Sequence, residues 1–92
     1  MPTDRWSAVE GSAAPLGVTF VEHESAYNFA IYSKHATGVI LLLYASGDAA
    51  KPMHQQRFDP LRNKSGRVWH CRLPAGLVDR AEHYAYRIEG PF

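Results

Sequence analysis

The chain has 92 residues, enough for one small domain, and a chain of this length buries only about 60 to 65% of its unfolded surface. Its composition, 46% hydrophobic and 21% charged, is ordinary for a folded domain and argues against disorder. The formal net charge is +1, and the basic residues are scattered among acidic ones. Without a basic stripe, nucleic acid is not expected as a partner.

In chain order, the sequence first shows a segment of small and polar residues without periodicity, residues 1–14, which is expected to be a flexible N-terminal arm. Segments rich in β-branched and aromatic residues follow, separated by turn residues, and each predicts a strand. Only residues 77–82 suggest a short helical turn. This spacing predicts an all-β fold for residues 15–92, an immunoglobulin-like β-sandwich of about seven strands. The strand candidates are 17–21, 27–33, 39–44, 53–58, 68–73 and 83–89.

One strand candidate, residues 39–44, is apolar at every position. A sandwich strand with one solvated face should alternate apolar and polar residues. Two interpretations fit this run. Either it is a central strand whose second face is covered by loops or by Lys and Arg stems of the same domain, or that face packs on a domain outside the chain.

Cysteine usage and hydropathy bear on the compartment. Cys71 is the only cysteine, so no internal disulfide is possible, which is unusual for a small secreted domain. The first residues contain no apolar run typical of a signal peptide, and no segment approaches the roughly 18 apolar residues of a membrane helix. The expected location is the cytoplasm or a plastid-like reducing compartment, with no membrane partner.

The residue types needed for catalysis do not occur in a useful pattern. Glycoside hydrolysis requires two carboxyl groups about 5 to 9.5 Å apart across a sugar, and the nine acidic residues fall mostly in predicted loops and strand ends. The five histidines lack the spacing of zinc ligands. Cys71 shares strand parity with Trp69 and Leu73 and is expected in the core. We therefore expect no catalytic residues, no metal site and no cofactor in this chain.

Four motifs give the chain a family resemblance: PLGVTF at 15–20, NFAIYSKHAT at 28–37, DPLRNKSGRVWHCRLP at 59–74 and YAYRIEGPF at 84–92. Their order and spacing resemble the N-terminal domain of isoamylase-type glycogen and starch debranching enzymes, carbohydrate-binding module family 48. The resemblance covers residues 15–92. It implies a domain that docks on a C-terminal catalytic barrel, outside this chain, which hydrolyses α-1,6 branch linkages in glycogen.

The resemblance also bears on sugar binding. Glycogen-binding members such as the module in the β subunit of AMP-activated kinase use two tryptophan platforms and a lysine. The second platform corresponds here to Phe92, the lysine position falls near Ala85, and the loop after Tyr44 has no tryptophan. We therefore expect only weak α-glucan binding, with Phe92, Trp69 and Tyr84 as candidate substrate-binding residues.

Three alternatives stay open at this point. In the first, the chain is an autonomous α-glucan-binding module that acts without a catalytic partner. In the second, it is the accessory domain of a branching enzyme or of a trehalose-forming hydrolase. The motif at 59–74 resembles isoamylases more than branching enzymes, so a debranching parent ranks first. A purely structural interaction domain is the third hypothesis.

Overall fold

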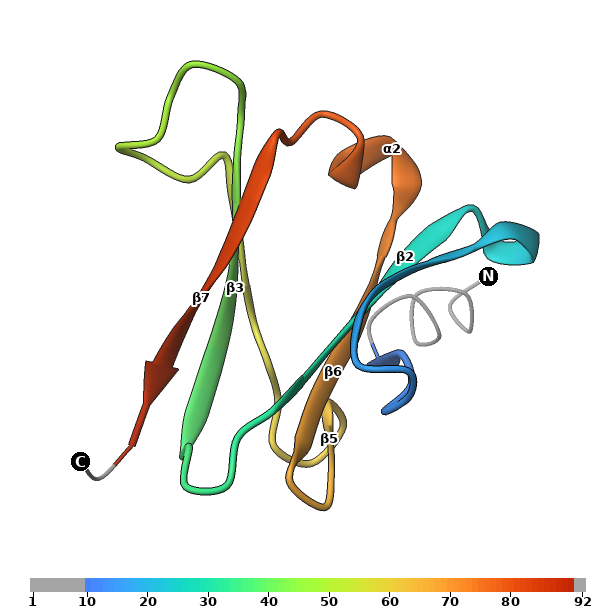
Figure 1. Ribbon diagram of the computed structural model, residues 1–92, viewed down its shortest axis with the longest axis vertical. Coiled ribbons are helices and arrows are strands. Elements are labelled where there is room, and N and C mark those ends of the chain that lie inside the picture. The colour runs from blue at the N-terminus through green and yellow to red at the C-terminus, as the bar shows by residue number, and fades with distance from the viewer. Residues whose placement is uncertain (1–9, 91–92) are drawn as a thin grey trace.

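The β-branched and aromatic segments form seven strands in the computed structural model, which describes residues 10–90 (Figure 1). Two helical turns, η1 (Glu22–Glu24) and α2 (Ala75–Val78), interrupt them. The predicted helical turn thus begins two residues and ends four residues earlier than expected, directly after Pro74. The strands are β1 (Gly17–Val21), β2 (Ala26–Tyr32), β3 (Gly38–Tyr44), β4 (His54–Arg57), β5 (Lys64–Ser65), β6 (Val68–Pro74) and β7 (His83–Glu89).

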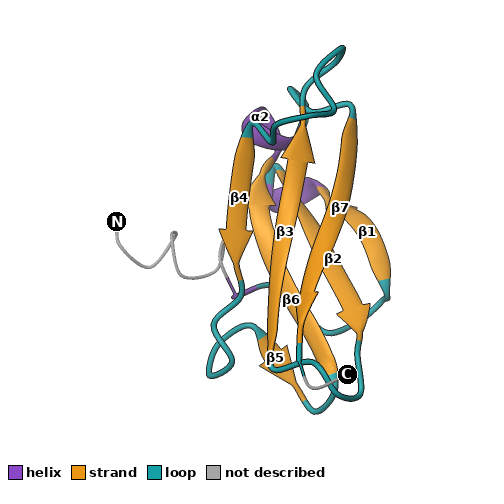
Figure 2. Ribbon diagram, turned by 90° about the vertical axis from the view of Figure 1, so that its left-hand side faces the viewer, coloured by secondary structure: helices purple, strands orange, loops and turns teal. Residues whose placement is uncertain are grey.

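All strand pairs are antiparallel, and they form two sheets. The four-stranded sheet has the order β1-β2-β6-β5 and the three-stranded sheet the order β4-β3-β7. Figure 2 shows the three-stranded sheet in front of the other, as expected for a β-sandwich. The predicted all-β, immunoglobulin-like sandwich is confirmed. The two-residue strand β5 was not predicted, because it lies within a segment of turn-forming residues.

The core lies between the two sheets and uses alternate residues of the central strands. β2 and β6 contribute Phe29, Trp69, Cys71 and Leu73, which face alternate residues of β3. Period-two alternation explains this set, because successive side chains of a strand point to opposite faces of its sheet. Phe58, just after β4, closes the core on one side and makes an edge contact with Tyr86.

The apolar strand β3 is covered on both faces by this chain. Val39, Leu41 and Leu43 point into the core, and the outward Ile40 and Leu42 are only 5% and 6% exposed. In the strand register Ile40 lies between Arg57 and Arg87, and Leu42 lies between Gln55 and Ala85. Long side chains on the flanking strands shield such a surface with their apolar stems. The burial of Ile40 and Leu42 therefore supports the first interpretation, in which the domain itself covers the second face of this strand.

The outer face of the four-stranded sheet is covered in part by residues 10–12, which the sequence assigned to a flexible arm. The Ser12 amide donates to Asn28 Oδ1 at 2.7 Å, and Asn28 Nδ2 donates to the Ser12 carbonyl at 3.0 Å. Arg72 Nη2 donates to Ser12 Oγ at 3.0 Å. For these described residues the flexible-arm expectation is corrected, since the buried amide of Asn28 binds them. Residues 1–9 lie outside the described part of the chain.

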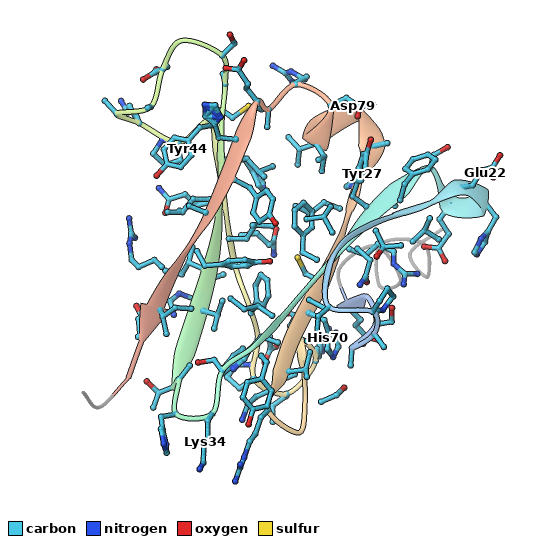
Figure 3. All side chains as sticks on the ribbon, viewed as in Figure 1. Glu22, Tyr27, Lys34, Tyr44, His70 and Asp79 are labelled. Carbon is cyan, nitrogen blue, oxygen red and sulfur yellow. The ribbon has the colours of Figure 1, made fainter. Side chains whose placement is uncertain are left out.

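His70 provides a second attachment for this segment, as Figure 3 shows beside the N-terminal ribbon. Its Nδ1 lies 2.5 Å from the Glu10 carbonyl oxygen, and its Nε2 lies 2.9 Å from Ser65 Oγ. A carbonyl oxygen only accepts, so Nδ1 carries the proton and, in the neutral ring, Nε2 accepts from the serine hydroxyl. His70 thus acts as a structural residue that joins β5, β6 and the segment before β1.

Candidate functional site

The sandwich leaves one side open, between β1 and β7. In the β1–β2 register Val18 pairs with Phe29 and Phe20 with Tyr27, so all four side chains lie on the inner face of their sheet. Figure 2 shows β1 beyond the edge strand β7 of the facing sheet. Because no strand faces it there, Phe20 remains 51% exposed. An inner sheet face without a partner strand produces a groove.

This β1–β7 groove encloses an open cavity of about 260 Å³. Its floor is the core itself, formed by Phe29 and Leu43, each 1% exposed. Val18 and Tyr27 form one wall and Tyr84 the other, and the segment after α2 closes one end. The cavity is slightly below the roughly 300 Å³ at which small-molecule sites begin, a size that suits a compact ligand.

The aromatic rings of the two walls are fixed by their neighbours. Tyr84 makes edge-to-face contacts with Phe29 and Tyr86, with ring centroids 5.5 and 5.9 Å apart, and is still 48% exposed. Across the groove, Tyr27 packs on Phe20 with centroids 5.1 Å apart. Such contacts hold aromatic planes in place without removing them from solvent. The groove therefore presents two oriented, accessible rings.

The polar rim of the groove comes from the segment between α2 and β7. The Tyr27 hydroxyl donates to Asp79 Oδ1 at 3.0 Å, and Figure 3 shows Tyr27 pointing toward Asp79. This hydrogen bond raises the pKa of Tyr27, because it stabilises the protonated phenol. Glu82 and His83 continue the rim toward Tyr84. Hydrogen-bond acceptors and apolar core side chains thus line the same groove.

Of the three predicted substrate-binding residues, Trp69 lies in the core and not at an accessible surface. It is 1% exposed and lies among the core residues, and the Lys64 ammonium lies 5.2 Å from the centre of its ring. A buried indole cannot present a face to a sugar, so this part of the prediction is corrected. The parity of Trp69 with Cys71 and Leu73 already indicated a core position.

The other two candidates differ in their position. Tyr84 is exposed and forms a wall of the β1–β7 groove, so its role in binding stays a prediction. Phe92 lies outside the described residues. Ala85, near which the resemblance predicts the family lysine position, faces outward on β7 beside Leu42. The groove itself was not predicted, because it depends on the strand order of two sheets, which no local pattern shows.

Residues 10–90 give little support for a metal site or a reactive thiol. No three His, Cys, Asp or Glu side chains of this part lie close enough together to hold a metal ion. Cys71 is buried, and burial raises the pKa of its thiol to about 12, which keeps it in the unreactive protonated form. Within the same residues, no helix has the length and apolar character needed to cross a membrane.

Two antiparallel sheets packed in this order, with a side groove of aromatic and acidic residues, define an immunoglobulin-like β-sandwich module. The family model that matches the chain, over residues 15–92, is carbohydrate-binding module 48, the isoamylase N-terminal domain. The chain belongs to this family.

Similar sequences are found in bacteria and plants. The glycogen debranching enzyme of Serratia proteamaculans is 40% identical over 82 residues, which cover 89% of this chain and 11% of that protein. The chloroplastic isoamylase SU1 of Zea mays is 37% identical over 84 residues, covering 89% of this chain and 10% of that protein. The chain therefore spans about a tenth of the length of the curated relatives it matches.

Solved structures show the same fold. A product complex of SpuA, a multi-modular glycogen-degrading pneumococcal virulence factor, has a TM-score of 0.65 at 19% identity, covering 94% of this chain and 9% of that one. The pullulanase SAP of Group B Streptococcus in complex with maltotetraose has a TM-score of 0.62 at 16% identity, covering 92% and 11%. At such identities the likeness concerns the fold alone.

Proposed function

We propose that this domain is the N-terminal accessory module of an isoamylase-type debranching enzyme, which hydrolyses α-1,6 branch linkages in glycogen or a related glucan. The observation that carries the proposal is the family match over residues 15–92, together with 40% identity to a glycogen debranching enzyme. The debranching enzymes and isoamylases matched are about ten times as long as this chain. That length accommodates a catalytic barrel of about 250 residues.

In this proposal the module docks on the catalytic barrel and helps to orient the glucan, and it carries no catalytic residues of its own. Its accessible aromatic groove supports a contact with the substrate. We propose the cytoplasm as its location, although several similar plant proteins are chloroplastic isoamylases. The autonomous glucan-binding module remains the alternative.

The test uses the complete protein that contains this domain, purified and incubated with glycogen. We expect the release of linear malto-oligosaccharides and a rise in reducing ends, while the 92-residue chain alone gives neither. New branch points would identify a branching enzyme, and trehalose would identify a trehalose-forming hydrolase. Either product would contradict the proposal, as would a complete protein without a catalytic domain.

A further inference from the structure

We propose that the β1–β7 groove binds glucose units of an α-glucan, with Tyr84 as the stacking platform and Asp79 and Glu82 as hydroxyl acceptors. The inference rests on the proposed function for the identity of the glucan and adds the place where it binds. The groove differs from the outward surface of β7 around Ala85, to which the family comparison pointed.

The aromatic walls carry the first part of the argument. A pyranose ring has apolar C–H faces that stack on aromatic planes, and such contacts are favourable when the ring is already held in place. Tyr84 is held by Phe29 and Tyr86, and Tyr27 is held by Phe20 and Asp79. Neither wall needs to order a flexible side chain on binding.

The polar rim of the groove gives the second reason for a sugar ligand. Sugar hydroxyls donate hydrogen bonds, and the carboxylates of Asp79 and Glu82 accept them. An apolar protein surface placed over the same rim would strip water from these carboxylates without replacing its hydrogen bonds, which is costly. The acidic rim also disfavours anions such as phosphate. A neutral polyhydroxy ligand therefore fits the groove better than either alternative.

The size of the cavity limits how many glucose units can enter the groove. A volume of about 260 Å³ is small compared with the range typical of drug-sized ligands. It admits a short stretch of the glucan, and the remaining units stay in solvent. So few contacts predict a dissociation constant of about 1 mM for maltoheptaose, since that affinity corresponds to only about 4 kcal/mol.

The experiment is a chemical-shift titration of the ¹⁵N-labelled 92-residue chain with maltoheptaose. We expect the amide signals of Val18 and of residues 78–84 to shift together, while those of Arg57 and Arg87 on the outward face of the three-stranded sheet stay in place. Tyr84→Ala should weaken binding about two- to tenfold, by the loss of one stacking contact. Tyr84→Phe should retain binding, because it keeps the ring.

The matched control is Tyr32→Ala, which removes a tyrosine that is 54% exposed on the opposite face of β2, away from the groove. It should bind like the unchanged chain. Because Tyr84 also packs on Phe29, thermal melts must show that each variant is folded. Glu82→Gln, at the exposed rim, tests the groove without disturbing this packing and should weaken binding several-fold.

Three outcomes would overturn the inference: no shifts at high millimolar maltoheptaose, shifts confined to the outward face of the three-stranded sheet, or full binding by folded Tyr84→Ala and Glu82→Gln variants. None of these touches the proposed function, since a complete protein that debranches glycogen establishes it independently. Conversely, groove binding by a chain whose complete protein does not debranch would leave the site in place and remove the parent activity.

Discussion

Arg57 and Glu89 join across the central strand β3, directly over Gly38. Arg57 Nη1 and Nη2 donate to the two oxygens of Glu89 at 3.0 and 2.8 Å, and the pair links the edge strands β4 and β7 of one sheet. A Cβ atom at Gly38 would collide with Glu89 Oε1. The absence of a side chain at Gly38 therefore makes this bidentate pair possible.

This relationship predicts that the effect of Gly38→Ala on the free energy of unfolding depends on Glu89, and that it loses or reverses its sign when Glu89 is removed. Gly38→Ala should destabilise the unchanged chain, because the methyl group displaces the Glu89 carboxylate. In a Glu89→Ala background the same substitution should be neutral or stabilising by up to about 1 kcal/mol, since alanine restricts the unfolded backbone more than glycine. Urea unfolding of the four chains measures the effect. Equal costs in both backgrounds would contradict the prediction.

The same ion pair predicts a pH dependence. Hydrogen bonds from Arg57, and its positive charge, lower the pKa of Glu89 from its ordinary value. A carboxyl group with a lowered folded-state pKa contributes stability above its unfolded pKa of about 4.3, and this contribution is lost as the pH falls through the folded-state pKa.

The measurement is the coupling energy between Arg57→Gln and Glu89→Gln, from unfolding at neutral pH and at successively lower pH values below about 4.3. We expect a stabilising coupling energy at neutral pH that shrinks toward zero in acid. It should be small at every pH, because both side chains are well exposed to solvent. A coupling energy that grows as the pH falls would show that a titratable group other than Glu89 determines its pH dependence.

The attachment of residues 10–12 predicts that a chain beginning at Pro15 is less stable than one beginning at Glu10. The shorter chain loses both backbone hydrogen bonds to Asn28 and the carbonyl partner of His70. We expect a loss of about 1 to 3 kcal/mol in the free energy of unfolding, since each net hydrogen bond contributes about 1 kcal/mol. Ser12→Ala, which keeps the backbone bonds, should cost less. Equal stability of the two chains would show that the attachment is unimportant.

The buried thiol gives a prediction about reactivity. Cys71 is fully buried, and its pKa is raised to about 12, so an aromatic disulfide reagent at mildly alkaline pH should label it only as fast as the domain unfolds. The matched control is Ser46→Cys in a Cys71→Ser background, which places a thiol in an exposed turn. Similar labelling of the two thiols under native conditions would contradict the described burial.

The strand positions could largely be predicted, because period-two patterns and turn residues are local. β1 and β7 have the predicted bounds, and β3 begins one residue earlier than expected. The burial of Ile40 and Leu42 depends on which side chains of neighbouring strands cover them, which is a property of the sheet register. For the same reason, the all-apolar run of β3 was compatible with two interpretations, and only the structure distinguishes between them.

The site was harder to predict than the fold. Tyr84 was identified as a candidate, but Val18, Tyr27 and Asp79 were not, because they meet only when β1 extends past β7. The segment before β7 is far in the sequence from β1 and β2, and it shares no motif with them. Trp69 was proposed on account of its residue type, whereas its neighbours in β6 determine its burial.

The strand β1 has hydrogen-bonded neighbours on one side only and no facing sheet over its inner side. Few contacts therefore oppose its separation from β2, and local opening of a native protein begins in such elements. In a hydrogen-exchange experiment the amides of β1 should exchange well before those of β3, through an opening that leaves the core intact. If so, the Val18 side of the groove would open while Tyr27 and Tyr84, on β2 and β7, stay in place.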